Sequence, residues 1–223
     1  MKFETNVKFN SREDRMKYVH DKYNPLFKKS LLDVGADECK MMELLDEGVE
    51  YKGIGLGSDN PNLIQVNLET DKVPLEDNSY ETVMCLDVLE HLENIHEVFD
   101  ELCRVSNKHV LISLPNPYSD FMHYFKNGKY YENKDMKFYG LTPERESDRH
   151  KWFYSPADAI AFINYRADKA GFKVVDFQSN RSSFFGKKWK AKVRKFMFNK
   201  LFKGNVDVSN FEYSTMWWVL EKK

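Results

Sequence analysis

Two groups of acidic and histidine residues carry the side chains best suited to chemistry. Asp87, Glu90 and His91 follow an apolar run in the order D-x-x-E-H. His150 lies in a later segment with the sequence DRHKWF. Carboxylates and imidazoles in such positions can take a proton from a hydroxyl or an amine, or bind a divalent cation. We therefore predict His91, His150 and Asp87 as the catalytic residues.

Glu90 and His91 also have a purely structural interpretation. At the start of a helix, a carboxylate and an imidazole can cap and pack the first turn without binding a metal ion. We prefer this interpretation and assign no metal ligands, with a divalent cation near the acceptor as the alternative. The proton acceptor is then His91 or His150.

Short apolar runs alternate with amphipathic segments along the chain. This alternation predicts a single doubly wound α/β sheet, whose ligands bind at the carboxyl ends of the strands. Asp87, Glu90 and His91 fall at such an end. The predicted strands are Leu31–Gly35, Tyr51–Leu56, Leu63–Asn67, Thr82–Leu86, Val110–Leu114, Phe172–Phe177 and Ser214–Leu220.

Helices are predicted from apolar periodicity and from residues that start or stop a helix. The first covers about residues 10–23, between a start at Ser11 and a stop at Pro25, and an apolar stripe predicts another that ends at Gly48. The remaining helices are Ile95–Val105 and a segment from Pro156 to about Ala170, capped by Ser155 and stopped by Gly171.

Bulk properties favour one soluble domain. The chain has 223 residues and a formal charge of -1, which argues against a protein that coats nucleic acid. Cys39, Cys85 and Cys103 have no CxxC spacing, so we expect neither disulfides nor a zinc site. Residues 1–14 contain no apolar signal segment, and no apolar stretch reaches the roughly 20 residues that cross a bilayer. We expect a cytoplasmic location.

Several motifs together resemble the class I S-adenosylmethionine (SAM) dependent methyltransferases. They are LLDVG at Leu31–Gly35, Asn67-Leu68-Glu69, and the stretch from Val73 to Pro117. The resemblance implies a Rossmann-like seven-stranded sheet with an antiparallel last strand, helices on both faces, and SAM as the cofactor. It also implies a set of cofactor-binding residues: Asp33, Gly35, Ala36, Gly55, Asn67, Leu68, Leu86 and Asp87.

The chain departs from the family pattern at two places. After Gly35 the family has further glycines, whereas this chain continues Ala-Asp-Glu-Cys. Family members usually end the second strand with an acid that binds both ribose hydroxyls, and here Gly55 takes that position, with Asp59 as a possible substitute. Two interpretations follow: SAM binding is retained, which we prefer, or the chain is a non-catalytic binding or regulatory protein.

Residues 118–155 form a long insertion on the acceptor side. Long irregular insertions in compact domains are usually functional. Arginine, histidine and lysine beside aromatic rings suit an anionic or sugar-like acceptor, although Trp152 and Phe153 can instead anchor the insertion to the sheet. Side chains that can line an acceptor pocket, or form a plain lid, are Tyr118, His123, Tyr124, Tyr130 and Tyr131.

Residues 184–204 are basic and amphipathic. They contain no acid, and Trp189, Val193, Phe196, Met197 and Leu201 recur at helical spacing. Such a helix can lie on an anionic membrane surface or bind the phosphates of a lipid-linked acceptor. The alternatives are a helix packed on the sheet with its lysines in water and, less favoured, RNA binding.

The sequence thus predicts a SAM-dependent methyltransferase that acts on a hydroxyl or amine of a small-molecule or sugar-like acceptor. The predicted acceptor includes phosphorylated and lipid-linked molecules. The resemblance associates the motifs with surface-glycan biosynthesis. Peripheral contact with the inner membrane surface would pass through residues 184–204. We do not expect a nucleic acid partner.

Overall fold

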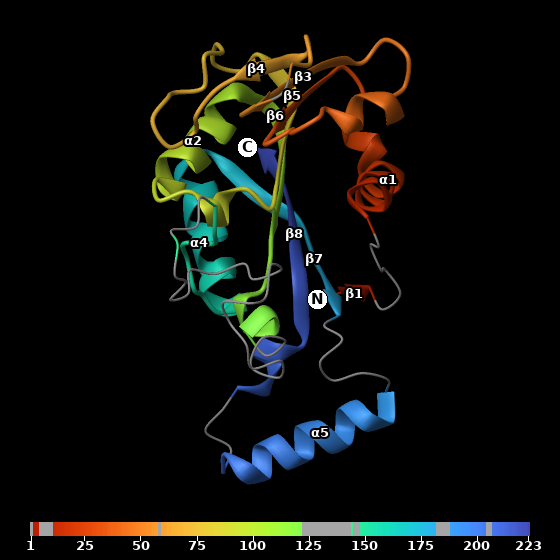
Figure 1. Ribbon diagram of the computed structural model, residues 1–223, viewed down its shortest axis with the longest axis vertical. Coiled ribbons are helices and arrows are strands. Elements are labelled where there is room, and N and C mark those ends of the chain that lie inside the picture. The colour runs from red at the N-terminus through yellow and green to blue at the C-terminus, as the bar shows by residue number, and fades with distance from the viewer. Residues whose placement is uncertain are drawn as a thin grey trace.

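The computed structural model describes residues 2–4, 11–57, 59–121, 144, 148–181, 188–203 and 207–223. Its centre is an eight-stranded sheet in the order β1-β7-β8-β6-β5-β2-β3-β4 (Figure 1). The strands are β1 (Lys2–Glu4), β2 (Ser30–Val34), β3 (Glu50–Gly55), β4 (Leu63–Gln65), β5 (Tyr80–Leu86), β6 (Ser106–Leu114), β7 (Phe172–Arg181) and β8 (Tyr213–Lys222).

The strand directions match the predicted fold. β8 pairs antiparallel with both β6 and β7, whereas the other pairs of neighbouring strands are parallel. All the predicted strands are present and form the seven-stranded methyltransferase-like sheet. The additional strand, β1, extends one edge of the sheet by pairing with β7. It is too short to have an apolar pattern that would predict a strand.

Helices cover both faces of the sheet (Figure 1). α1 (Arg12–Tyr23) lies on one face, and α2 (Ile95–Val105) and α4 (Pro156–Lys169) lie on the other. Ser11 caps α1, because its side chain accepts a hydrogen bond from the Asp14 backbone. Ser155 and Asp158 form a capping box at the start of α4. The predicted bounds of these helices are therefore confirmed within one or two residues.

The helix predicted after the first strand is wrong in type. The segment forms only a 3₁₀ helix, η2 (Lys40–Leu44). Asp37 and Cys39 just before it have φ values of 50° and 59°, in the left-handed region, so the chain turns too tightly to begin an α-helix. Met41 is still buried, so this segment packs against the core as expected. The other short 3₁₀ helices are η1 (Asn24–Leu26), η3 (Leu89–His91) and η5 (Val208–Phe211).

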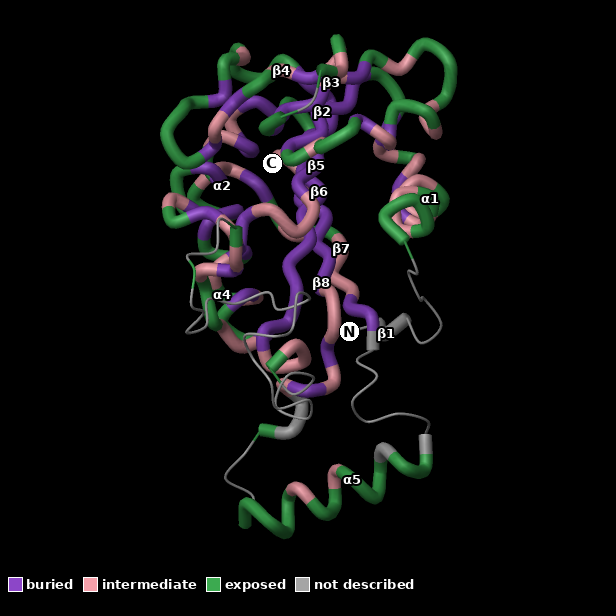
Figure 2. Tube along the Cα trace, in the orientation of Figure 1, coloured by how far each residue is buried: buried purple, intermediate pink, exposed green. Residues whose placement is uncertain are grey.

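The core lies on both sides of the sheet, as expected for parallel strands (Figure 2). Every residue of β2 is buried. Cys39, Cys85 and Cys103 are free thiols and all buried. Burial raises the pKa of Cys103 to about 12 and that of Cys85 well above its usual value. The prediction of unpaired cysteines is confirmed.

One helix stands apart from this core. α5 (Lys188–Leu201) lies beyond the end of the sheet, and its described residues are mostly exposed (Figures 1 and 2). The interpretation in which this helix packs on the sheet is therefore wrong. Within the described part of the chain, no helix is long and apolar enough to cross a membrane.

Candidate active site

A cavity of about 620 Å³ opens at the carboxyl ends of β2, β3 and β5. This volume falls in the range typical of pockets for small ligands. All the residues predicted to bind the cofactor line this cavity: Asp33, Gly35, Ala36, Gly55, Asn67, Leu68, Leu86 and Asp87. The crevice expected from the sequence is therefore open, and the fold brings the predicted set together.

Gly35 forms the turn that follows β2. Its φ is +84°, and an added Cβ would lie 2.2 Å from Val88 Cγ2, so only glycine fits there. The backbone N–H groups of Gly35 and Ala36 donate to the Ile54 carbonyl oxygen, at 2.7 and 3.0 Å. Both donors are therefore engaged within the sheet by the Ile54 carbonyl oxygen.

Gly55 leaves room where the family has an acid. An added Cβ would lie 3.7 Å from the backbone nitrogens of Ala36 and Asp37, which is ordinary van der Waals contact. Asp59 is exposed and does not line the cavity, so it does not replace the missing carboxylate. The acids that line the cavity near this position are Asp37 and Glu38.

Asp33 is a buried acid at the base of the cavity. Burial raises its pKa from 3.8 to about 7, while a hydrogen bond from Tyr51 and the charge of Arg15 oppose the shift. The Tyr51 hydroxyl donates to Asp33 Oδ2 at 3.0 Å. Asp33 therefore changes its charge near neutral pH, beside the space that a cationic cofactor would occupy.

Asp87 is held by two partners in the cavity. Arg15 Nη1 lies 2.9 Å from Asp87 Oδ2, and the Ser113 hydroxyl donates to Asp87 Oδ1 at 2.6 Å. Arg15 Nη2 also donates to Ser113 Oγ at 3.1 Å. Arg15 is a cavity residue that no sequence motif predicted. Arg12, one turn earlier on α1, also lines the cavity, so a basic face at the start of α1 was the available indication.

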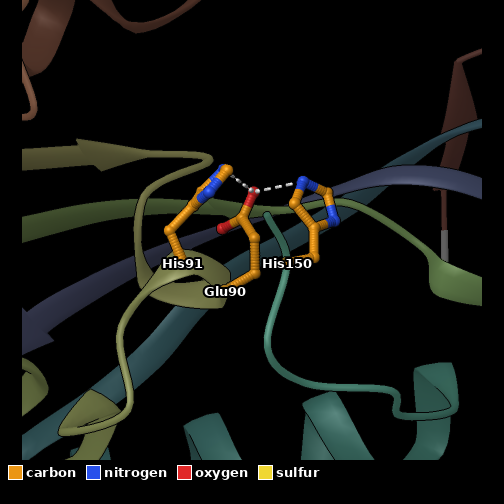
Figure 3. Close-up of side chains that lie close together, drawn as sticks. All are labelled: Glu90, His91 and His150. Carbon is orange, nitrogen blue, oxygen red and sulfur yellow. Dashed lines mark ion pairs between the residues drawn. The ribbon is translucent and has the colours of Figure 1, made fainter. Parts of the chain in front are cut away.

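Glu90, His91 and His150 converge at one side of the site (Figure 3). Glu90 is fully buried, and its Oε1 lies 3.9 Å from His91 Nε2 and 3.8 Å from His150 Nε2. The two imidazole rings are 4.7 Å apart, edge to face. His91 lines the cavity, and His150 is buried behind it.

The segment around His150 is anchored to the loop that carries Glu90. The Lys151 backbone donates to the Glu90 carbonyl oxygen at 2.8 Å, and the Trp152 indole donates to the Leu92 carbonyl oxygen at 2.7 Å. Asp148 Oδ1 lies 2.7 Å from His91 Nδ1. The two groups of chemically active residues in the sequence therefore form one site.

The expectation that Glu90 and His91 cap the following helix is wrong. Both lie in η3, whereas α2 begins at Ile95 with Asn94 at its N-cap. The Asn94 side chain makes no cap hydrogen bond and instead donates to the Leu68 carbonyl oxygen at 2.8 Å. Glu90 is therefore buried beside two imidazoles without serving the helix start.

Aromatic residues of the insertion lie next to this site. Trp152 anchors its segment as expected, although to the Leu92 loop rather than to the sheet. Phe153 is 56% exposed, and its ring lies 5.1 Å from that of Tyr118. Other predicted acceptor-pocket residues lie outside the described part of the chain: His123, Tyr124, Tyr130 and Tyr131.

Known proteins resemble this chain in sequence. A family described as "Methyltransferase domain" matches residues 11–176. The ubiquinone biosynthesis O-methyltransferase of Photobacterium profundum is 27% identical over 67% of this chain and 68% of its own length. The small RNA 2'-O-methyltransferase of Tetrahymena thermophila is 28% identical over 56% of this chain, but only 38% of its own length.

Solved structures share the fold. A SAM-dependent methyltransferase from Archaeoglobus fulgidus superimposes with a TM-score of 0.62 at 19% identity, covering 96% of both chains. The open cavity and the family match do not support the interpretation of a non-catalytic regulatory protein. This chain belongs to the methyltransferase domain family and is an enzyme that uses SAM as its cofactor.

Proposed function

We propose that this enzyme is an O-methyltransferase that binds a divalent cation beside the acceptor hydroxyl, through Glu90, His91 and His150. The observation that carries the proposal is the convergence of these three side chains at the edge of the cofactor cavity (Figure 3). Both sequence relatives are named as O-methyltransferases, which favours a hydroxyl over an amine as the acceptor group.

The donor atoms suit a cation chemically. One carboxylate oxygen and two imidazole nitrogens lie within 4.8 Å of one another, and this mixture of ligands suits magnesium or a transition metal. Ligand atoms of one ion stand about 3 Å apart, so small side-chain movements would complete the site. Asp148 bonds the other ring nitrogen of His91, an arrangement that orients imidazole ligands in metal sites.

In this proposal, the methyl group passes directly from the cofactor to the acceptor oxygen, and the cavity residues position both. The methyl carbon leaves the sulfonium and bonds to the acceptor oxygen; the electron pair stays on sulfur, and the hydroxyl proton passes to water. A bound cation would lower the pKa of the acceptor hydroxyl. Asp87, held by Arg15, helps to shape the cavity wall between cofactor and acceptor. Positioning of the methyl carbon against the acceptor oxygen supplies the rest of the rate.

The acceptor proposed is a small or sugar-like molecule with neighbouring hydroxyls, because two adjacent oxygens can bind one cation together. Lys151 and Arg12 line the cavity, paired with Glu69 and Asp37, so a phosphorylated acceptor would bind them in competition with these carboxylates. The association with surface-glycan biosynthesis and the cytoplasmic location stay predictions from the sequence. RNA is the competing acceptor class, because one relative is named for it.

The test measures formation of S-adenosylhomocysteine from SAM with a panel of acceptors: a catechol, a sugar with vicinal hydroxyls, an amine analogue and a short RNA. Each is assayed after treatment with EDTA and after adding back Mg²⁺, Mn²⁺ or Co²⁺. We expect activity on a vicinal diol that EDTA abolishes and a cation restores. Binding of Mn²⁺, followed by electron paramagnetic resonance, gives a second readout that does not require turnover.

Glu90→Gln keeps the side-chain size and removes the charge, so it should lower kcat/KM about 100-fold or more and weaken Mn²⁺ binding. Glu221→Gln is the matched control, because Glu221 pairs with Lys173 far from the cavity. Equal Mn²⁺ binding by wild type and Glu90→Gln would contradict the cation site. Activity that survives EDTA but is lost in His91→Ala would instead favour His91 as the proton acceptor.

A further inference from the structure

α5 lies at the carboxyl edge of the sheet, beyond the ends of β7 and β8. It connects the end of β7 at Arg181 to the start of β8 at Tyr213, by way of η5. Because β8 runs antiparallel to β7, both points lie at the carboxyl edge of the parallel strands. The cavity opens at the ends of other strands of that edge, β2, β3 and β5, whereas α5 lies below the ends of β7 and β8 (Figure 1).

One side of α5 attaches it to the enzyme. The ring of Phe198 lies 5.4 Å from that of Phe202 and 6.0 Å from that of Phe211 in η5. Lys195 forms an ion pair with Glu212, which precedes β8. Phe211 in turn contacts the ring of Tyr118, in the segment that follows β6. These contacts fix which side of α5 faces away from the protein.

The outward side of α5 is apolar and uncovered. We call this side the apolar stripe and define it as Trp189, Val193, Phe196, Met197 and Leu201. Their exposed fractions are 67, 46, 67, 62 and 73%. At 100° per residue they span about 140° of the helix surface, centred about 170° from Lys195, and Lys200 falls within this arc. An exposed apolar stripe of this width normally packs against another protein surface or a membrane.

The residues beside the apolar stripe are cationic. Helical geometry places Lys192 along one border, and Lys190 and Arg194 along the other. Lys190, Lys192 and Arg194 are exposed, and α5 contains no acidic residue at all. The whole chain has a formal charge of only -1, so this helix concentrates positive charge locally.

We propose that α5 docks this enzyme onto the surface of an anionic phospholipid bilayer. The apolar stripe would enter the boundary between headgroups and acyl chains, and the flanking lysines and arginine would bind lipid phosphates. An anionic bilayer fits better than a protein groove, because it satisfies the exposed aromatic residues and both cationic borders together. Docking would hold the end of the molecule that carries α5 against the membrane. It does not depend on the methyl acceptor proposed above.

The test is sedimentation of the full-length protein with vesicles. One set contains phosphatidylcholine alone and the other contains about one third phosphatidylglycerol, each at low salt and at about 0.5 M NaCl. We expect at least about tenfold tighter binding to the anionic vesicles, weakened by salt. We also expect a blue shift of tryptophan emission on binding, which Trp189→Phe removes while binding persists.

The variant Phe196→Glu/Met197→Glu should weaken vesicle binding by about tenfold or more. Tyr165→Glu is the matched control, because Tyr165 on α4 is 68% exposed and should not affect vesicle binding. Unchanged binding of S-adenosylhomocysteine shows that each variant is folded. Failure of the wild type to bind anionic vesicles would overturn the proposal, as would equal binding by the double variant. Self-association without vesicle binding, abolished in the double variant, would also overturn it and make the apolar stripe an interface between two copies.

Discussion

Asp148 holds the imidazole of His91 so that its Nε2 faces Glu90. The hydrogen bond is 2.7 Å long and joins two parts of the chain that are distant in sequence. Asp148 is largely exposed, whereas Glu90 is fully buried. His91 lies between them and so connects the surface of the insertion to the interior of the site. The orientation of His91 therefore depends on the last part of the insertion, which carries Asp148.

Asp148→Asn should impair catalysis through His91. An amide at this position makes a weaker bond than a carboxylate and no longer favours one ring orientation. We expect kcat to fall about tenfold, with KM for SAM nearly unchanged. Steady-state kinetics across pH provide the measurement, because a positioning role should also change the pH profile of kcat. Asp168→Asn is the control, since Asp168 pairs with Lys223 away from the cavity. An unaltered pH profile would assign Asp148 a merely structural role.

Gly55→Asp should strengthen cofactor binding. Its added Cβ would meet only ordinary contacts, and the carboxylate would stand at the end of β3, where family members bind both ribose hydroxyls. We expect the Kd of SAM to fall about tenfold by isothermal titration. Gly55→Asn is the matched control, with the same size and no charge, and should give a smaller gain. Weaker binding by Gly55→Asp would mean that the ribose does not lie beside residue 55.

SAM binding should become tighter as pH rises through about 7, in part because of Asp33. The raised pKa of this buried carboxyl leaves it mostly neutral at pH 6 and mostly ionised at pH 8, and the ionised form attracts the cationic cofactor. Isothermal titration between these pH values should show a gain of up to about tenfold that Asp33→Asn lacks. Titration of the cofactor's own amine is common to both proteins and cancels in the comparison.

The same shift has a defined effect on stability. The folded state keeps the Asp33 proton up to about pH 7, whereas the unfolded chain releases it near its ordinary pKa of 3.8. Since the folded state binds more protons within this window, Asp33 makes the free energy of unfolding fall as pH rises from about 4 to 7. Thermal melts of wild type and Asp33→Asn should therefore diverge over this range, with the variant relatively more stable at pH 8. Parallel curves would contradict the assigned pKa.

Local patterns accounted for most of the fold. Ser11 and Pro25 bound α1 correctly, and Ser155 marked the start of α4, because caps and proline act within one helical turn. The segment after β2 was mistaken for an α-helix, because its apolar spacing does not reveal the left-handed backbone at Asp37 and Cys39. Backbone conformation of this kind depends on packing against β3, which is distant in the sequence: Cys39 Sγ lies 2.7 Å from where a Cβ on Gly53 would stand, and Asp37 N lies 3.7 Å from where a Cβ on Gly55 would stand.

The site was predicted less completely than the fold. Motifs located Gly35, Asn67 and Asp87, because each follows a recognisable strand. The contact between His150 and Glu90 depends on the path of the insertion, which brings its last residues back to the loop after β5. The spacing of residues along the sequence does not reveal that path. Arg15 was not predicted for the same reason. Its ion pair with Asp87 depends on the first turn of α1 lying close to the carboxyl ends of β5 and β6.

The buried thiols make this protein convenient for site-directed spectroscopy. Cys39, Cys85 and Cys103 are shielded, and the raised pKa of Cys85 and Cys103 keeps those sulfurs protonated and slow to react at neutral pH. A maleimide probe would therefore report almost entirely from a single thiol introduced at the surface, for example by Lys190→Cys. The wild-type chain can serve as its own unlabelled background, with no need to remove native cysteines.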